Sequence, residues 1–167
     1  MPNCNVQFMR IDTRMVHGQI VTKWATVNHC KHVIIVDKAL DADPFMANFY
    51  KKAAQKGVKI DVSSPVKAAK AWNKESFGPA GRNAMIVFKD ATNVYNLWKE
   101  GFPVKEVDIG NQVAGNGKKQ ISREVFLSDD EFAKLKEMYE GGVRVYMQII
   151  PEDSPMEFPE VEKKFNS

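Results

Sequence analysis

Residues 6–36, VQFMRIDTRMVHGQIVTKWATVNHCKHVIIV, contain the pattern that decides the fold. A strand-like segment over 6–11 is followed by a polar turn, then by apolar residues at helical spacing, and then by the continuously apolar segment 32–36. A strand that is apolar at every position is typical of a parallel sheet covered on both faces. The stretch therefore predicts a strand, a helix and a second strand of an α/β fold.

The same alternation continues along the chain. Further strands are expected at 58–62, 84–88, 107–109, 125–127 and 143–149, and further helices after the capping residues Asp43, Ser64, Asp90 and Ser128. These elements predict an α/β, single-domain, doubly wound, mostly parallel sheet of about seven strands with helices on both faces. We expect the domain to span residues 1–167, with a core over about 5–150, the last strand at a sheet edge, and a surface tail over 151–167.

Aromatic residues in the predicted helices are interpreted as core. Phe45, Phe49 and Tyr50 recur on one face of the helix after Asp43, with Met46 beside them. Tyr139 occupies a similar position in the helix after Ser128. We expect all of them to pack against the sheet.

Composition excludes several classes of protein. The 167 residues are 44% hydrophobic and 27% charged, which is ordinary for a globular domain and not for a disordered chain. No apolar run is long enough to cross a bilayer, and the first residues do not resemble a signal peptide, so a cytoplasmic location is expected. A net charge of +3 without a basic stripe gives no support for nucleic-acid binding.

Cysteine and histidine usage adds little chemistry. Cys4 and Cys30 are too few for a disulfide framework and suit a reducing compartment. His29, Cys30 and His32 superficially suggest metal ligands, but residues this close at a helix-to-strand junction need not point together. We expect no metal site there.

Four residues at the end of the first predicted strand point to phosphoryl chemistry. His17 offers a nucleophile that is neutral near pH 7, while Arg10 and Arg14 offer planar cations that bind anionic oxygens. Asp12 lies between the two arginines in sequence. The alternative is an ordinary ion pair beside a structural histidine, which each residue taken alone would favour. The combination in one turn, followed by Gly18, favours a phosphohistidine site at a helix amino terminus.

The run Arg-Ile-Asp-Thr-Arg-Met-Val-His-Gly-Gln over 10–19 resembles the active-site signature of component IIB of the mannose/fructose/sorbose-type sugar phosphotransferase system. The similarity continues at 33–37, at 43–44, at Ile109-Gly110-Asn111 and at 117–120, so that it covers nearly all of residues 5–150. Thr13 and Met15 depart from the family pattern at positions not expected to touch phosphorus.

The resemblance implies that His17 takes a phosphoryl group from a phosphohistidine on component IIA and passes it to a sugar during uptake. Arg14 would contact the phosphoryl group, Arg10 would stabilise its charge, and Asp12 would fix an arginine or the imidazole tautomer. The sugar would come from membrane components IIC and IID, which would hold the chain at the inner face of the membrane. No cofactor is implied, and the base for the sugar hydroxyl is either Asp12 or a group on a partner.

The polar loop over 111–120 is a second candidate site, because loops at the carboxyl ends of parallel strands collect ligands. Asn111, Gly117 and Lys118 are expected to bind substrate, together with Gly18 and Gln19 of the first motif. A solvated glycine-rich turn is the alternative. The loop resembles versions in relatives that handle N-acetylgalactosamine or galactosamine, which favours an amino sugar.

Two other functions remain open from the sequence. In the first, phosphorylated His17 controls a signalling or transcription partner without any sugar transfer. In the second, the chain is a nucleotide-binding module, although the turn after the first strand offers only Gly18 where a glycine-rich phosphate loop is needed.

Overall fold

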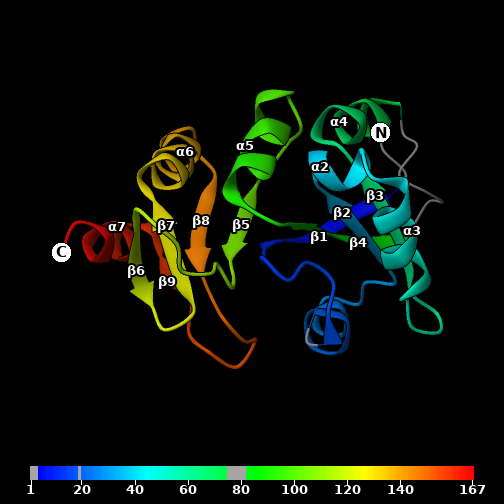
Figure 1. Ribbon diagram of the computed structural model, residues 1–167, viewed down its shortest axis with the longest axis horizontal. Helices are drawn as coiled ribbons and strands as arrows, with labels where there is room; N and C mark the ends of the chain where they lie inside the picture. Colours follow the sequence, from blue (N-terminus) through cyan, green and yellow to red (C-terminus); the bar gives the residue numbers. More distant parts are fainter. Residues whose placement is uncertain (1–3, 19, 75–81) are drawn as a thin grey trace.

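The structure is a computed structural model that describes residues 4–18, 20–74 and 82–167. Its main feature is a seven-stranded sheet with the strand order β3-β2-β4-β1-β5-β8-β9 (Figure 1). The strands of this sheet are β1 (Cys4–Ile11), β2 (His32–Val36), β3 (Lys59–Ser63), β4 (Arg82–Phe88), β5 (Glu106–Ile109), β8 (Arg144–Met147) and β9 (Met156–Glu157). All pairings are parallel except that of β8 with β9. The predicted fold class is confirmed.

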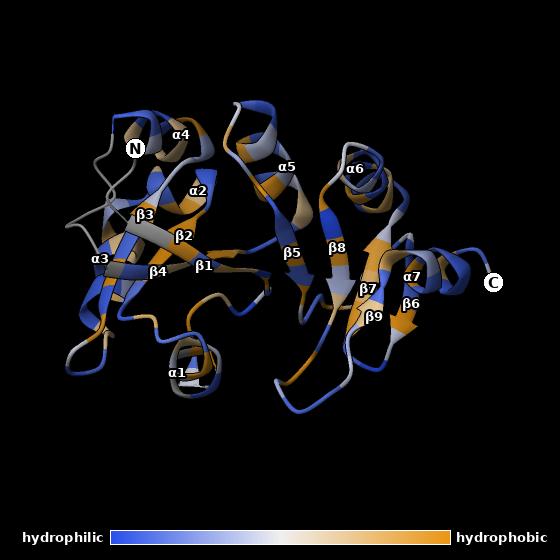
Figure 2. Cartoon of the chain, turned by 180° about the vertical axis from the view of Figure 1, so that it is seen from behind, coloured by the Kyte–Doolittle hydropathy of each residue, from blue (hydrophilic) through white to orange (hydrophobic). Residues whose placement is uncertain are grey.

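Helices cover both faces of the sheet. One face carries the π-helix η1 (Ile20–Trp24), α1 (Ala25–Val27), α2 (Lys38–Asp41) and α3 (Pro44–Lys52), and the other α4 (Pro65–Asn73), α5 (Ala91–Lys99), α6 (Asp129–Glu140) and α7 (Phe158–Phe165). Alternate residues of β2 supply the two cores: Val33 and Ile35 face α2, whereas Ile34 and Val36 face α5. Figure 2 shows this apolar character along β2.

Short polar residues start the long helices as the sequence predicts. The side chains of Asp43, Ser64, Asp90 and Ser128 each accept a hydrogen bond from a backbone amide of the first helical turn. At α6 the carboxylate of Glu131 reciprocates by accepting from the Ser128 amide at 2.8 Å. The short helix α2, capped by Asp37, is an element that the sequence analysis missed.

The expected strand at 125–127 is present but belongs to a separate sheet. It is β7 (Val125–Ser128), which pairs antiparallel with β6 (Lys118–Ser122) in a hairpin beside the main sheet. Its place in the seven-stranded sheet is taken by the two-residue strand β9, so β8 is not the edge strand that the alternation of 143–149 predicted. The sequence also predicts a surface loop over 73–82, and most of this segment lies outside the described residues.

Residues 151–167 do not form the surface tail that was expected. After β9 they form α7, whose Phe158, Val161 and Phe165 are at most 4% exposed and belong to the core beneath α6. The Phe132 ring of α6 stacks on Phe165 with a centroid distance of 4.0 Å. Prolines and acidic residues are common in this segment, but three apolar residues at helical spacing are sufficient to bury one face.

The interpretation of the α3 aromatics as core is wrong for Phe45 and Phe49, whereas Tyr50 packs partly buried against the core. Phe45 is 80% exposed and Phe49 61% exposed, while Met46 and, on α6, Tyr139 are exposed to a smaller extent. The helix rests on the sheet through Ala47 and the partly buried Tyr50. The helical spacing of apolar residues does not show which face of α3 points to the sheet. In α3 the face with the small side chain of Ala47 points inward. Within the described residues, no helix is both long and apolar enough to span a membrane.

Candidate active site

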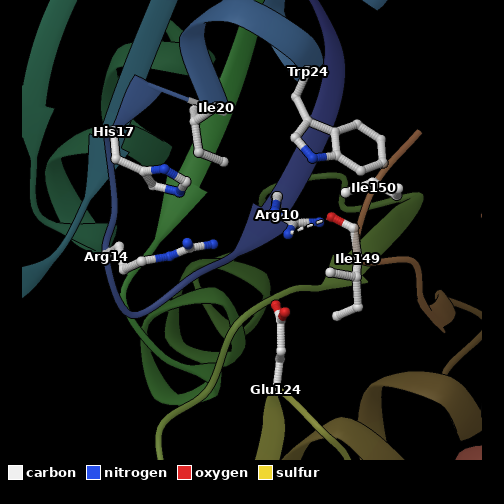
Figure 3. A pocket seen from close by; sticks show the side chains of 8 residues that line it. All are labelled: Arg10, Arg14, His17, Ile20, Trp24, Glu124, Ile149 and Ile150. Carbon is white, nitrogen blue, oxygen red and sulfur yellow. Dashed lines mark hydrogen bonds between the residues drawn. The ribbon is translucent and has the colours of Figure 1, made fainter. Parts of the chain in front are cut away.

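The His17 loop, residues 12–18, begins where β1 ends and leads directly into η1. β1 lies between β4 and β5 in the sheet, so the loop emerges near the middle of the carboxyl edge. A cavity of about 120 Å³ opens beside it (Figure 3). Its lining residues are Arg10, Arg14, His17, Ile20, Trp24, Glu124, Ile149 and Ile150.

Asp12 is the centre of the polar contacts in this loop. Its carboxylate is fully buried and accepts hydrogen bonds from Nε of Arg14 at 3.2 Å and from the Arg14 backbone amide at 3.0 Å. A second Arg14 nitrogen lies 3.3 Å from the other carboxylate oxygen, which makes the pair a two-pronged fork. Nε of Arg10 and Nε2 of His17 both lie 3.4 Å from that same oxygen. One carboxylate therefore orients all three cationic or titratable groups.

Arg10 is held almost completely inside the protein. Its register partner on β5 is Asp108, and the two side chains form a buried ion pair. The same guanidinium donates to the carbonyl oxygens of Gln148 at 2.7 Å and Ile149 at 3.1 Å, and it packs 4.9 Å from the centroid of the Trp24 ring. With these partners Arg10 contributes fixed positive charge at the base of the cavity. It also ties β1 to the segment after β8.

Arg14 differs from Arg10 because 45% of its side chain is exposed. Figure 3 shows its guanidinium extending along the cavity toward Arg10, with the His17 ring above it. The contacts to Asp12 use Nε and one terminal nitrogen. Donors on the other terminal nitrogen remain for an anion in the cavity.

The His17 environment favours a neutral imidazole. Partial burial lowers the pKa of His17 below its ordinary value of 6.5, and the nearby guanidinium groups of Arg14 and Arg10 lower it further. The Asp12 carboxylate acts in the opposite direction without reversing the shift. A neutral ring keeps one nitrogen lone pair free for nucleophilic attack.

Met15 gives the loop its shape. It has a positive φ of 55°, which is unfavourable for a residue with a side chain, and its amide donates to the Asp12 carbonyl at 2.9 Å. Burial of the Met15 side chain in the core beneath η1 offsets this cost. Because of this tight turn, the side chains of Arg14 and His17 line the same cavity.

The loop after β5 joins this arrangement through its first residues only. The carbonyl oxygen of Asn111 accepts from the Thr13 amide at 2.8 Å, and the Gln112 side chain donates to Thr13 Oγ1 at 3.2 Å. Farther along, Gly117 occupies an exposed turn with φ of 72°, and Lys118 pairs with Glu131 at 3.3 Å. Neither Gly117 nor Lys118 lines the cavity. Their predicted contacts with substrate stay predictions.

Two further predicted site residues flank His17. A Cβ atom on Gly18 would meet no described atom within 4 Å, so the protein itself does not require a glycine for space at this position. Gln19 lies outside the described residues.

His29, Cys30 and His32, which superficially suggest metal ligands in the sequence, follow α1 and lead into β2. His29 has a positive φ of 54° at the end of α1, whereas Nε2 of His32 contacts the Asp61 carboxylate at 2.7 Å on β3. Across the ranges that the structure describes, no cluster of three or more His, Cys, Asp or Glu side chains has metal-binding geometry.

Sequence reasoning missed three of the eight residues that line the cavity. Glu124 comes from the hairpin turn between β6 and β7, and Ile149 and Ile150 come from the segment after β8. No local motif marks these residues. The pairing of Arg10 with Asp108 and with the carbonyls beyond β8 brings this part of the chain to the cavity.

Comparison with known proteins identifies the family. The family described as "PTS system sorbose subfamily IIB component" matches residues 6–167. The fructose-specific EIIB component of Bacillus subtilis is 27% identical over 94% of this chain and 95% of its own. The sorbose-specific EIIB component of Lacticaseibacillus casei is 28% identical over 89% of each. Among solved structures, manxB from Thermoanaerobacter tengcongensis aligns over the whole of both chains with a TM-score of 0.89 and 30% identity.

The family match includes the His17 loop and α7. The matches confirm the resemblance found in the 10–19 motif and give the chain the role of a sugar phosphotransferase component. The chain belongs to the sorbose subfamily of IIB components of the phosphotransferase system.

Proposed function

We propose that His17 accepts a phosphoryl group from a phosphohistidine on a IIA component and transfers it to a sugar. One observation carries the proposal: a neutral imidazole and a partly free guanidinium, those of His17 and Arg14, line one small cavity and share the buried carboxylate of Asp12. Phosphoryl transfer needs mainly positioning and charge stabilisation, and these groups supply both.

The geometry favours Nδ1 of His17 as the nucleophile. Nε2 faces the Asp12 carboxylate at 3.4 Å, so the tautomer with its proton on Nε2 is preferred and the lone pair is on Nδ1. As Nδ1 forms its bond to phosphorus, the P–N bond to the donor imidazole breaks and the donor nitrogen recovers its electron pair. The positive charge that develops on the His17 ring is stabilised by Asp12.

Arg14 stabilises the equatorial phosphoryl oxygens, while buried Arg10 acts as fixed positive charge behind them. The transferred phosphoryl group is anionic, so the guanidinium groups of Arg10 and Arg14 that line the cavity favour its docking.

Membership of the family supports a proposal for the sugar and the partners. Relatives of similar identity are named for fructose, sorbose and N-acetylgalactosamine, so overall identity does not distinguish among these sugars. We favour an amino sugar from the 110–120 loop. We also propose that IIC and IID present the sugar at the inner face of the membrane, where this chain acts from the cytoplasm.

The test begins with the purified chain, phosphoenolpyruvate, the two general phosphotransferase proteins and a mannose-type IIA. Acid-labile phosphate is mapped by mass spectrometry under alkaline conditions. We expect phosphate on His17 alone, no labelling of His17→Ala, and full labelling of the matched control His29→Ala. Labelling of another residue in His17→Ala would contradict the assignment, as would an unmodified chain with several phosphorylated IIA donors.

A further inference from the structure

Glu124 is an acidic side chain in the cavity to which the proposed function gives no role. It lies in the turn between β6 and β7, and Figure 3 shows its carboxylate pointing into the cavity from the side opposite His17. Its side chain is half-buried. Throughout the described parts of the chain, no salt bridge partner lies within reach of this carboxylate, although Arg10 and Arg14 line the same cavity.

The backbone of Glu124 is fixed relative to the His17 loop. Its carbonyl oxygen accepts from the Gln112 amide at 3.0 Å, and the Gln112 carbonyl accepts from the Phe126 amide at 2.9 Å. The Gln112 side chain donates to Thr13 Oγ1, and Thr13 is anchored to Asn111 at 2.8 Å. A continuous chain of hydrogen bonds thus joins the Glu124 turn to the loop that carries His17.

A carboxylate facing a phosphoryl site needs an explanation, because it repels the anion that the arginines attract. The Asp12 carboxylate does not line the cavity; it is fully buried and already accepts from Arg14, Arg10 and His17. The Glu124 carboxylate points into the cavity and has no ion-pair partner among the residues that the structure describes. A neutral sugar hydroxyl is a donor that such a carboxylate binds well.

The cavity size limits what enters. A volume of 120 Å³ corresponds to about four water molecules, enough for a phosphoryl group and one hydroxyl-bearing end of a sugar. Ile149 and Ile150 form an apolar wall next to Glu124, which suits the carbon face of that end. The remainder of the sugar would stay outside, with whatever presents it.

We propose that Glu124 is the general base of the second half-reaction, a role that rests on the proposed sugar transfer. Its carboxylate accepts a hydrogen bond from the attacking sugar hydroxyl and takes the proton as the new O–P bond forms. The P–N bond to His17 breaks in the same step, and the electron pair returns to the ring nitrogen, which leaves a neutral imidazole. Glu124 then releases its proton to water.

The experiment separates the two half-reactions. Wild-type protein and Glu124→Gln are each phosphorylated by IIA, purified, and mixed with membrane vesicles containing mannose-type IIC and IID. The vesicles are supplied in turn with fructose, sorbose, mannose or N-acetylgalactosamine, and single-turnover loss of phosphate from His17 is measured. Glutamine retains the hydrogen-bond acceptor but cannot take the proton, so we expect transfer to the sugar to slow by about 100-fold. Labelling by IIA should change by at most about threefold.

Glu152→Gln is the matched control, because Glu152 is exposed in the segment after β8 and does not line the cavity. It should leave both half-reactions unchanged, whereas Glu124→Asp should restore part of the sugar transfer. Sugar transfer by Glu124→Gln at the wild-type rate would overturn the role of Glu124, as would an equal slowing of both half-reactions. Failure of the wild type to take phosphate from IIA would instead refute the proposed function itself.

Discussion

The loops that follow β1 and β5 leave adjacent parallel strands at the same edge of the sheet, but they use their polar residues differently. In the His17 loop, Asp12 gathers Arg10, Arg14 and His17 around one cavity. In the loop after β5, Asn111 supports Thr13, while Lys118 turns away to pair with Glu131. This comparison shows that a polar, glycine-rich composition is not sufficient to form a phosphoryl site. A shared buried counter-charge brings side chains together, and only the first loop has one.

The largest effect is expected from removing that counter-charge. Asp12→Asn keeps the side-chain size but leaves Arg10 buried with less compensation, so the free energy of unfolding should fall by about 3 kcal/mol. Phosphorylation of His17 should slow by about 100-fold or more, because Arg14 and the imidazole tautomer both lose their orienting group. Urea unfolding and quench-flow labelling measure the two quantities.

Asp41→Asn is the matched control for this change, because Asp41 pairs with Lys67 at the surface at 2.8 Å. It should cost less than about 1 kcal/mol and leave labelling unchanged. Equal effects of the two substitutions would show that Asp12 is not the organiser of the cavity.

The second prediction compares two glycines, one on each side of Asn111. A Cβ atom on Gly110 would lie 2.6 Å from Nε of Arg10, whose guanidinium is pinned by Asp108 and two carbonyls. Gly110→Ala should therefore cost about 1–3 kcal/mol and slow labelling of His17. Gly115→Ala, farther along the same loop, meets its nearest atom at 3.5 Å and should be tolerated. If thermal melts found both variants equally stable, Arg10 would not be rigidly held.

The third prediction separates the two arginines by their exposure. Arg14→Lys keeps the charge but loses the planar fork, so labelling of His17 should slow by about tenfold while the melting temperature hardly changes. Arg123→Lys makes the same exchange at an exposed position outside the cavity and should have no effect. Unchanged labelling kinetics in Arg14→Lys would remove Arg14 from the phosphoryl site.

The sequence predicted the parts of the molecule that depend on local patterns. Three features could be predicted from neighbouring residues: strand β2, the capping residues and the phosphotransferase resemblance. Burial on both faces of a strand and capping of backbone amides each leave a local pattern in the sequence. The residues 10–17 motif also identified three of the cavity-lining side chains.

The parts that depend on tertiary contacts were not predictable. Ile149 lies at the cavity because its carbonyl accepts from Arg10, and Glu124 lies there because its turn pairs with Gln112 in the loop after β5. Phe45 was placed in the core because periodicity indicates an apolar face without showing whether anything covers it. Residues 151–167 pack as α7 because the β8–β9 pairing returns the chain to the sheet, which composition does not reveal.

The fourth prediction uses pH to test the His17 environment. The native pKa of His17 is below 6.5, so the unfolded chain binds a proton more readily between that pKa and 6.5. Relative to His17→Gln, the wild type should therefore lose stability as the pH falls through this range and regain it as the pH rises. Labelling should stay constant down to the native pKa and then decline. An imidazole titration followed by NMR gives that pKa directly, and a value above 6.5 would contradict the neutral nucleophile.

The smallest effect is expected at the tip of the second loop. The Lys118 ammonium lies 3.3 Å from Glu131 and outside the cavity, so Lys118→Ala should cost at most about 1 kcal/mol and leave labelling by IIA within about twofold of wild type. Lys56→Ala is the matched control, because Lys56 is exposed and forms no ion pair with the described residues; its removal should affect neither stability nor labelling. The rate of phosphoryl transfer to the sugar decides the role of the loop. A selective loss of this rate in Lys118→Ala would support the predicted contact of Lys118 with substrate. An ion pair that only holds the hairpin to α6 would instead affect stability and not a single half-reaction.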